Sequence, residues 1–565
     1  MINFPHITFP VSAMSPPRRR SSLLCLPLIT AVLPATASSP VPDPAAAVAV
    51  DITLAAPGVL EVAYHLPAAC TALPFIKHGS EGAGLRASWQ ALDDCGAADG
   101  DTLSRKSGAC PALRFRVPVT ADPVNGYPAA FPVGEGVYVH ASNYAVAPQC
   151  GAVAYHFSAP GIAVAGGAVQ GLASSTRDDA AALLLPAPLP PTPAGGTPFY
   201  FDAQLPAATV AQVRTVADGT VAYLKTTMPD APYLAPAVAV ARVSEPGGPN
   251  VGGDAADVLR LALYNWPAQP GPAEQAKLTL LVSHEFSHRF QLRDAVDGYP
   301  DARLIHEGGA EFLRWLVSVE QGWLTRAQAA EQLDAALADC LLDTDGQGWR
   351  GLNGRTVARN RLDYRCGLPV YVYALAARQG SGTAIGRLND FYRDVGQGRF
   401  PDFAHALECG ATPGCTPRWL PRLLGAAPMA AQWTTLLAAS ALARPAPPET
   451  AQRDAMVLRA LVQLMRDDCR GASSSTQTPD SVLLDAMRSC TTLTRDSEVV
   501  RIEGTTVFGD DSTLARLTAA CERGHVALGL RDNSVLDLPC RAPYHARTSF
   551  PHVDIDRVLG SLLRQ

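Results

Sequence analysis

The chain has 565 residues, 47% of them hydrophobic, which is enough for three or four domains with buried cores. Its 46 basic and 52 acidic residues give a net charge of −6, and neither sign gathers in a long run. This charge pattern argues against a nucleic-acid-binding protein and against one that adheres to a membrane surface.

The first 37 residues have the features of a secretory signal peptide. Arg18-Arg19-Arg20 is basic, and the apolar stretch from Leu23 to Leu33 is too short to span a bilayer. Ala35-Thr36-Ala37 then offers a small-x-small cleavage site. No later segment is long and apolar enough to be a transmembrane helix. We therefore predict a signal peptide over residues 1–37 and a mature protein that is secreted or periplasmic.

Residues 45–185 contain many short runs in which apolar and polar residues alternate. Examples are Val48 to Leu54, Leu113 to Val119 and Val137 to Val139. Proline, glycine and asparagine separate these runs, which predicts an antiparallel β domain. A linker rich in proline, Pro186 to Pro198, follows it.

Residues 199–440 are predicted to form an α+β domain. Apolar spacing from Val210 to Leu224 indicates a helix, while Pro236 to Val243 and Val258 to Tyr264 have the composition of strands. The next helix is predicted over Pro272 to Arg293, because proline suits a first helical position and an apolar stripe follows it. Further helices are predicted to about residue 440.

The helix predicted over 272–293 carries the motif His284-Glu285-Phe286-Ser287-His288. Two histidines one turn apart point the same way, so their imidazoles can bind one metal ion. Glu307, separated from His288 by eighteen residues, opens another helical run and can supply a third, anionic ligand. Glu285 is placed to deprotonate a water activated by that metal, and Glu311 can hydrogen-bond a ligand imidazole. The pattern predicts a hydrolytic site with one Zn²⁺ per chain.

This motif and its spacing, with Glu307-Gly308-Gly309-Ala310-Glu311, resemble the gluzincin metallopeptidases, and in particular aminopeptidase N-like enzymes. The resemblance implies a thermolysin-like catalytic domain. Tyr364-Arg365-Cys366-Gly367 is similar to a Tyr-x-x-Gly turn of that family, which implies that Tyr364 stabilises the oxyanion. A buried structural aromatic is the alternative for Tyr364, and Tyr371 or Tyr373 would then be the next candidates.

The C-terminal region, 450–565, begins after the proline-rich break Pro445 to Pro448. Two helices are predicted first, separated by a flexible segment from Gly471 to Asp480. Residues 496–539 then follow the order strand, helix, strand, strand. This order resembles the second half of a PDZ domain, and an ordinary disulfide-bonded α+β domain is the alternative.

The three predicted domains together resemble the secreted glycyl aminopeptidase family, with two departures. The interval of eighteen residues is shorter than that family usually has. No Gly-x-Met-Glu-Asn or Gly-Leu-Glu-His sequence precedes the zinc helix, where relatives use a glutamate to hold a free amino terminus. The corresponding stretch here is Pro246 to Asp254, and Asp254 or Asp257 is a candidate replacement.

Removal of the signal peptide would take Cys25 from the 13 cysteines and leave an even number, which fits an oxidising compartment. We predict disulfides between near neighbours in the sequence. The predicted pairs are Cys70/Cys95, Cys110/Cys150, Cys340/Cys366, Cys409/Cys415, Cys469/Cys490 and Cys521/Cys540.

These features predict a secreted zinc peptidase that acts on a peptide or protein substrate, with aminopeptidase activity as one option. One alternative is a zinc hydrolase of a non-peptide amide or epoxide. Another is a non-catalytic zinc-containing binding protein, in which the PDZ-like tail holds a peptide ligand. The presence of Glu285 favours an enzyme, because only turnover requires a general base.

Overall fold

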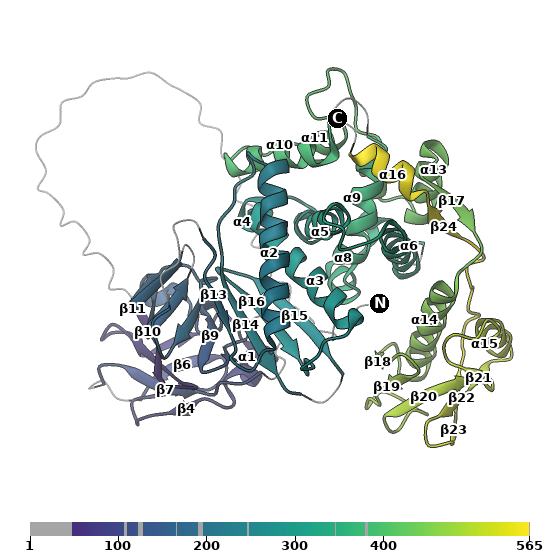
Figure 1. Cartoon of the computed structure of the whole chain (residues 1–565). Helices are drawn as coiled ribbons and strands as arrows, with labels where there is room; N and C mark the ends of the chain where they lie inside the picture. Colours follow the sequence, from purple (N-terminus) through teal and green to yellow (C-terminus); the bar gives the residue numbers. More distant parts are fainter. Residues whose placement is uncertain are drawn as a thin grey trace, which may run out of the picture.

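The computed structural model describes residues 48–106, 110–121, 128–164, 167–189, 196–245, 248–344, 346–378 and 382–563. The predicted signal peptide lies outside these residues, as does part of the predicted linker. Figure 1 shows a β-rich unit and a sheet with helices α2 and α3 beside it. A helical lobe comes next, and a smaller C-terminal lobe adjoins it.

The N-terminal unit is built on a nine-stranded sheet of order β4-β7-β2-β1-β10-β12-β9-β8, with β11 paired to β10. The alternation predicted for Val48 to Leu54 is confirmed, because Val48, Val50 and Ile52 are fully buried on one face. A small sheet of order β3-β6-β5 packs beside the large one. The elements of this unit are β1 (Val48–Ala56), β2 (Val59–His65), β3 (Ala72–Pro74), α1 (Gly79–Arg86), β4 (Gln90–Ala91), β5 (Gly96–Ala98), β6 (Thr102–Arg105), β7 (Leu113–Val117), β8 (Ala130–Val133), β9 (Gly136–His140), β10 (Val153–Val164), β11 (Gly167–Ser175) and β12 (Ala181–Leu185).

The prediction of a wholly antiparallel domain is wrong at one pair of strands. β1 and β10 run parallel, with Val48 opposite Val153. Parallel neighbours need a long crossover connection, and the chain between these two strands supplies one by forming the small sheet and strands β7 to β9. Sequence alternation cannot reveal this, because it reports which face is buried and not the direction of a neighbour.

The sheet next to α2 and α3 has four strands in the order β13-β14-β16-β15. β15 forms its edge and runs antiparallel to β16. Helix α3 packs on this sheet against β15 and α2, and its apolar side chains Leu278, Leu281 and Phe286 enter the same core. The elements are β13 (Phe199–Phe201), α2 (Ala207–Thr227), β14 (Ala237–Val243), β15 (Asn250–Ala255), β16 (Val258–Tyr264) and α3 (Pro272–Ser287).

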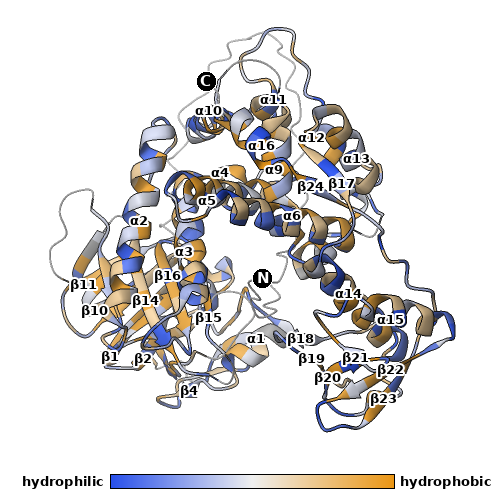
Figure 2. Ribbon diagram, turned by 45° about the vertical axis from the view of Figure 1, so that its right-hand side comes forward, coloured by the Kyte–Doolittle hydropathy of each residue, from blue (hydrophilic) through white to orange (hydrophobic). Residues whose placement is uncertain are grey.

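The helical lobe follows, and its helices share one large apolar core. In Figure 2 this lobe bridges the β-rich unit and the C-terminal lobe. Its helices are α4 (Arg293–Val296), a π-helix (Leu304–Gly308), α5 (Gly309–Glu320), α6 (Arg326–Asp343), α7 (Gly354–Arg359), α8 (Leu362–Arg365), α9 (Gly367–Ala376), α10 (Ala384–Gly396), α11 (Phe403–Glu408), α12 (Leu420–Leu423) and α13 (Met429–Ser440).

The C-terminal lobe joins a six-stranded sheet to two helices. The first predicted helix is present as α14, but the second is wrong: residues 482–484 form a strand, and another strand lies in the segment predicted to be flexible. Short strands of this kind are stabilised by their neighbours rather than by local propensity. The PDZ-like resemblance stays a prediction. The elements are α14 (Thr450–Asp468), β18 (Ser475–Gln477), β19 (Val482–Leu484), β20 (Ser497–Ile502), β21 (Thr505–Thr506), α15 (Thr513–Glu522), β22 (His525–Leu530) and β23 (Val535–Pro539).

The end of the chain returns from this lobe to the helical lobe. Strand β24 (Phe550–Val553) pairs antiparallel with β17 (Ala443–Ala446), which occupies part of the predicted proline-rich break. Helix α16 (Ile555–Leu562) then packs against α9 and α6. The C-terminal segment therefore supports the helices around the motif. Among the described residues, no helix combines the length and hydrophobicity that crossing a membrane requires.

The described residues form six disulfides, and four of the predicted pairs are confirmed: Cys340–Cys366, Cys409–Cys415, Cys469–Cys490 and Cys521–Cys540. The two predicted pairs in the β domain are wrong, because Cys70 bonds Cys150 and Cys95 bonds Cys110.

The strand order explains the first of these bonds. β2 ends and β10 begins at the same end of β1, where His65 lies opposite Ala49 and Val153 opposite Val48. Cys70 and Cys150 lie just beyond those strand ends and meet there, although 80 positions separate them in the sequence.

Candidate active site

Helix α3 carries the first half of the motif into the interior. Its last residues are buried, and His284 and Glu285 expose only 7% and 6% of their surface. The helix ends at Ser287, so the predicted end at Arg293 is wrong. A 3₁₀ turn, His288–Phe290, continues from it and keeps His288 on the same side as His284.

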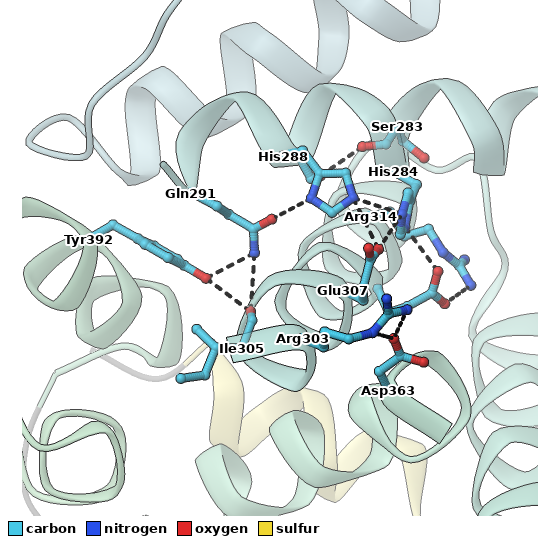
Figure 3. Close-up of polar contacts among 12 residues, drawn as sticks. Ser283, His284, His288, Gln291, Arg303, Ile305, Glu307, Arg314, Asp363 and Tyr392 are labelled. Carbon is cyan, nitrogen blue, oxygen red and sulfur yellow. Dashed lines mark hydrogen bonds and ion pairs between the residues drawn. The ribbon is translucent and has the colours of Figure 1, made fainter. Parts of the chain in front are cut away.

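The two histidines and Glu307 converge on one point (Figure 3). The Nε2 atoms of His284 and His288 are 3.0 Å apart. Glu307 Oε2 lies 3.6 Å from His284 Nε2 and 3.3 Å from His288 Nε2. Glu307 belongs to the π-helix, an irregular turn that is common at functional sites and that the sequence pattern did not reveal. The structure therefore brings together the three residues that the sequence predicts as ligands.

The donor set fits a zinc ion. Two imidazole nitrogens and one carboxylate oxygen are a ligand combination of hydrolytic zinc sites that leaves a fourth position open. The buried Oε2 of Glu307 makes no hydrogen bond within the described part of the chain. Its polar neighbours include the two imidazole nitrogens at 3.3 and 3.6 Å, and a cation between these three side chains would satisfy the buried oxygen better than these long contacts do.

The Nδ1 atom of each histidine, on the opposite side of the ring from Nε2, contacts a supporting side chain. His284 Nδ1 lies 2.9 Å from Glu311 Oε1, and Glu311 in turn pairs with Arg314. Burial alone would raise the pKa of Glu311, but Arg314 and His284 outweigh it and lower that pKa to about 2. Glu311 is thus a fixed anion that orients the imidazole of His284, as the sequence predicts.

Gln291 orients His288, and the sequence analysis did not predict this role. His288 Nδ1 lies 2.8 Å from Gln291 Oε1, and the Gln291 amide donates to Tyr392 Oη at 2.9 Å (Figure 3). The position of Gln291, three residues after a ligand, was the available signal. His306 adds a second contact, because its ring stacks on that of His288 with 4.0 Å between centroids.

Glu285 lies beside the three candidate ligands, next to the edge strand β15. A Cβ atom at Gly253 would be only 3.0 Å from Glu285 Oε1, so the backbone of β15 passes directly by this carboxylate. Burial raises the pKa of Glu285 to about 8. A cation held by the neighbouring ligands would oppose that effect and favour the ionised form, which a general base requires.

The two acidic residues considered as amino-terminal anchors have other partners. Asp254 Oδ2 lies 2.7 Å from Arg260 Nε, and Tyr138 donates to its other oxygen at 2.8 Å. Asp257 lies 3.2 Å from Arg177. Asp254 is close enough to Glu285 to add to the rise of its pKa, whereas Asp257 belongs to the contact with the N-terminal unit.

Tyr364 lies on α8 and borders the site. Its ring stacks on that of His284, with centroids 5.7 Å apart and planes inclined by 21°. Burial, together with the charge of Glu307, raises the pKa of Tyr364 well above its usual value. The phenol is therefore neutral and able to donate a hydrogen bond. Tyr371 donates instead to the carbonyl of Ile305, and Tyr373 packs against Trp433.

Two glycines allow the Glu307 turn and helix α9 to touch through their backbones. A Cβ at Gly308 would lie 2.7 Å from the Cα of Gly367. Gly367 begins α9 directly after Cys366, whose disulfide to Cys340 ties this junction to α6. The position of Glu307 therefore depends on a contact that admits no side chain.

We expect Gly308→Ala to destabilise the protein. Alanine usually favours a helix over glycine by about 0.5–1 kcal/mol, but here its methyl group would overpack the contact with Gly367, which typically costs about 1–3 kcal/mol. The matched control is Gly354→Ala on α7, where a Cβ meets nothing within 4 Å. Urea unfolding of both variants measures the difference. Equal stability of the Gly308 and Gly354 variants would contradict the expected clash.

Comparison with solved structures finds a protein of similar overall fold. An aminopeptidase N family protein from Idiomarina loihiensis matches over 91% of this chain and 100% of its own, with a TM-score of 0.54 and 12% identity. An M1 zinc metallopeptidase from Deinococcus radiodurans matches over 65% of this chain and 90% of its own, with 14% identity and a TM-score of 0.34. No protein-family model and no curated protein sequence matches the chain. The predicted resemblance to aminopeptidase N-like gluzincins is confirmed at the level of the fold.

Proposed function

We propose that this chain is a secreted zinc-dependent peptidase in which His284, His288 and Glu307 hold the metal. The observation that carries the proposal is the convergence of these three side chains beside Glu285, with a buried oxygen of Glu307 that makes no hydrogen bond among the described residues. The likeness to the Idiomarina protein supports a peptidase fold. The six disulfides are consistent with an oxidising compartment.

In this proposal each residue has a defined task. A zinc ion bound here would act as a Lewis acid and lower the pKa of a water molecule. Glu285 Oε1 or Oε2 accepts the proton of the attacking water and later delivers it to the leaving amine. The Tyr364 hydroxyl donates to the carbonyl oxygen as negative charge develops. Glu311 and Gln291 keep the two imidazoles in orientation.

The edge strand β15 gives an extended substrate a place to bind. Its outer side carries no paired strand among the described residues, and it passes beside Glu285. A peptide added to that edge would present its backbone carbonyls to the site in sequence. This supports a peptide rather than a small non-peptide substrate. Aminopeptidase activity is the more specific form of this proposal, and it is suggested by the Idiomarina protein, which is described as a member of the aminopeptidase N family. A peptide ligand for the C-terminal sheet is not supported by the comparisons and forms no part of the proposal.

The test is cleavage of a mixed peptide library by the purified mature protein, with both product termini identified by mass spectrometry. Loss of single amino-terminal residues would support an aminopeptidase, and internal cuts would support an endopeptidase. Absence of any cleavage by protein that contains stoichiometric zinc would overturn the proposed function.

Zinc binding is expected to depend on the three proposed ligands. We expect one zinc per chain in the wild type and almost none in His288→Ala after dialysis, because a two-ligand site cannot retain the ion. Elemental analysis by mass spectrometry measures this, and His405→Ala serves as the control, since His405 lies on α11 outside the site. Full zinc occupancy in His288→Ala would refute the ligand set.

A further inference from the structure

Arg361 lies beside the site and has no part in the mechanism proposed above. It links α7 to α8 and adopts the left-handed conformation, with φ of 51°. This region is unfavourable for a residue with a side chain and is more often occupied by glycine or asparagine. Left-handed residues other than glycine persist where the surrounding structure holds them, and they concentrate at functional sites.

The side chain of Arg361 reaches the ring of Tyr364. Its guanidinium carbon lies 4.1 Å from the centroid of that ring, within the range of a cation–π interaction. The same ring stacks on His284. Arg361 therefore contacts the proposed oxyanion donor, and through it reaches a proposed ligand.

The surrounding groups keep this cation charged. Burial works against the charge of Arg361, but Tyr364, Asp363 and Glu307 outweigh it and raise its pKa. Asp363 also forms an ion pair with Arg303, whose Nε lies 2.8 Å from its carboxylate. A fixed positive charge thus lies next to the phenol of Tyr364 and close to Glu307.

We propose that Arg361 is a positioning residue that holds the Tyr364 phenol toward the substrate and strengthens its hydroxyl as a hydrogen-bond donor. A neighbouring cation withdraws charge from a phenol and favours donation to an oxygen that becomes negative. This inference rests on the proposed peptidase function.

The sharpest test is Arg361→Gly. Glycine accepts φ of 51° without strain, so this variant removes the cation without disturbing the backbone. We expect its melting temperature to stay close to that of the wild type, because relief of the backbone strain offsets the loss of the cation–π contact. We expect kcat to fall on the order of tenfold, a coupling typical of residues in contact, while KM changes little. A merely structural arginine would give the opposite result, with stability lost and kcat retained.

Two further variants separate the charge from the contact. Arg361→Lys keeps a cation over the ring and should recover most of kcat. Arg365→Met is the matched control, because Arg365 lies on α8, directly after the Arg361 linker, but pairs with Asp343 of α6. It should leave kcat unchanged. If Arg361→Lys is as slow as Arg361→Gly, the charge is not the cause and the inference is wrong.

A double mutant tests whether Arg361 acts through Tyr364. On a Tyr364→Phe background the hydroxyl is absent, so Arg361→Gly should change kcat by less than about twofold. An equal loss on both backgrounds would overturn the inference while leaving the peptidase function intact. A zinc-loaded wild type that cleaves no peptide would instead overturn the proposed function, and the inference with it.

Discussion

Glu285→Gln is expected to keep the fold and the bound zinc and to lose hydrolysis. Glutamine has nearly the same shape as glutamate, so the packing of α3 beside β15 should survive. Its amide cannot accept a proton from water, and a positioned general base typically contributes on the order of 10²–10⁴ in rate. We therefore expect kcat to fall by about this factor, measured on a peptide that the library identifies as a substrate.

The control for this variant is Glu274→Gln on the same helix. Glu274 accepts a hydrogen bond from the backbone of Gly271 at 2.9 Å at the start of α3, and glutamine can still accept it. Both variants lose one negative charge from one helix, but only Glu285 lies beside the ligands. Wild-type turnover by a pure, zinc-loaded Glu285→Gln preparation would refute the general-base assignment.

The placement of the candidate site residues was largely predictable because it follows local helical geometry. Two histidines four positions apart share a face of any helix, and Glu311 follows Glu307 by the same interval. The sequence could not show the π-helix at Glu307 or the 3₁₀ turn at His288, since both arise where helix ends meet their neighbours. Gln291 lies only three residues after His288, but its contact with Tyr392, 101 positions away, has no local signature.

The fold was predictable to the extent that burial alternates along single elements. Strands β14 and β16 were expected within one residue of their observed bounds. Strand direction and order depend on the whole sheet, so the parallel pair of β1 and β10 and the Cys70–Cys150 bond were not foreseen. Four disulfides were predictable because each joins consecutive cysteines outside any other disulfide loop, whereas Cys95–Cys110 is nested inside the Cys70–Cys150 loop.

In the C-terminal region, too, local spacing predicts a long helix but not short strands or tertiary contacts. The helix pattern of α14 is visible in its apolar spacing, and the structure confirms it. Residues 482–484 lack enough length for any period to be read, and their pairing with β20 decides their conformation. The return of α16 to α9 is a tertiary contact with no local signature.

Tyr364→Phe separates family resemblance from local chemistry. The change removes one hydroxyl and almost no volume, and the stacking of the ring on His284 does not need that hydroxyl. If Tyr364 donates to the oxyanion, the bond forms mainly in the transition state, so the loss should appear in kcat rather than in KM. Removing one such donor typically costs on the order of 10²–10³ in kcat. Steady-state kinetics on a cleaved peptide measures both constants.

Tyr371→Phe is the matched control, because its hydroxyl donates to the carbonyl of Ile305 at 3.0 Å inside the core. Losing that bond should cost stability, on the order of 1 kcal/mol, and leave kcat near the wild-type value. Tyr364→Phe should show the reverse, with zinc content and melting temperature unchanged. If the two variants behave alike, and both lose stability without a specific fall in kcat, Tyr364 is a core aromatic. Another residue would then have to donate the hydrogen bond to the carbonyl oxygen.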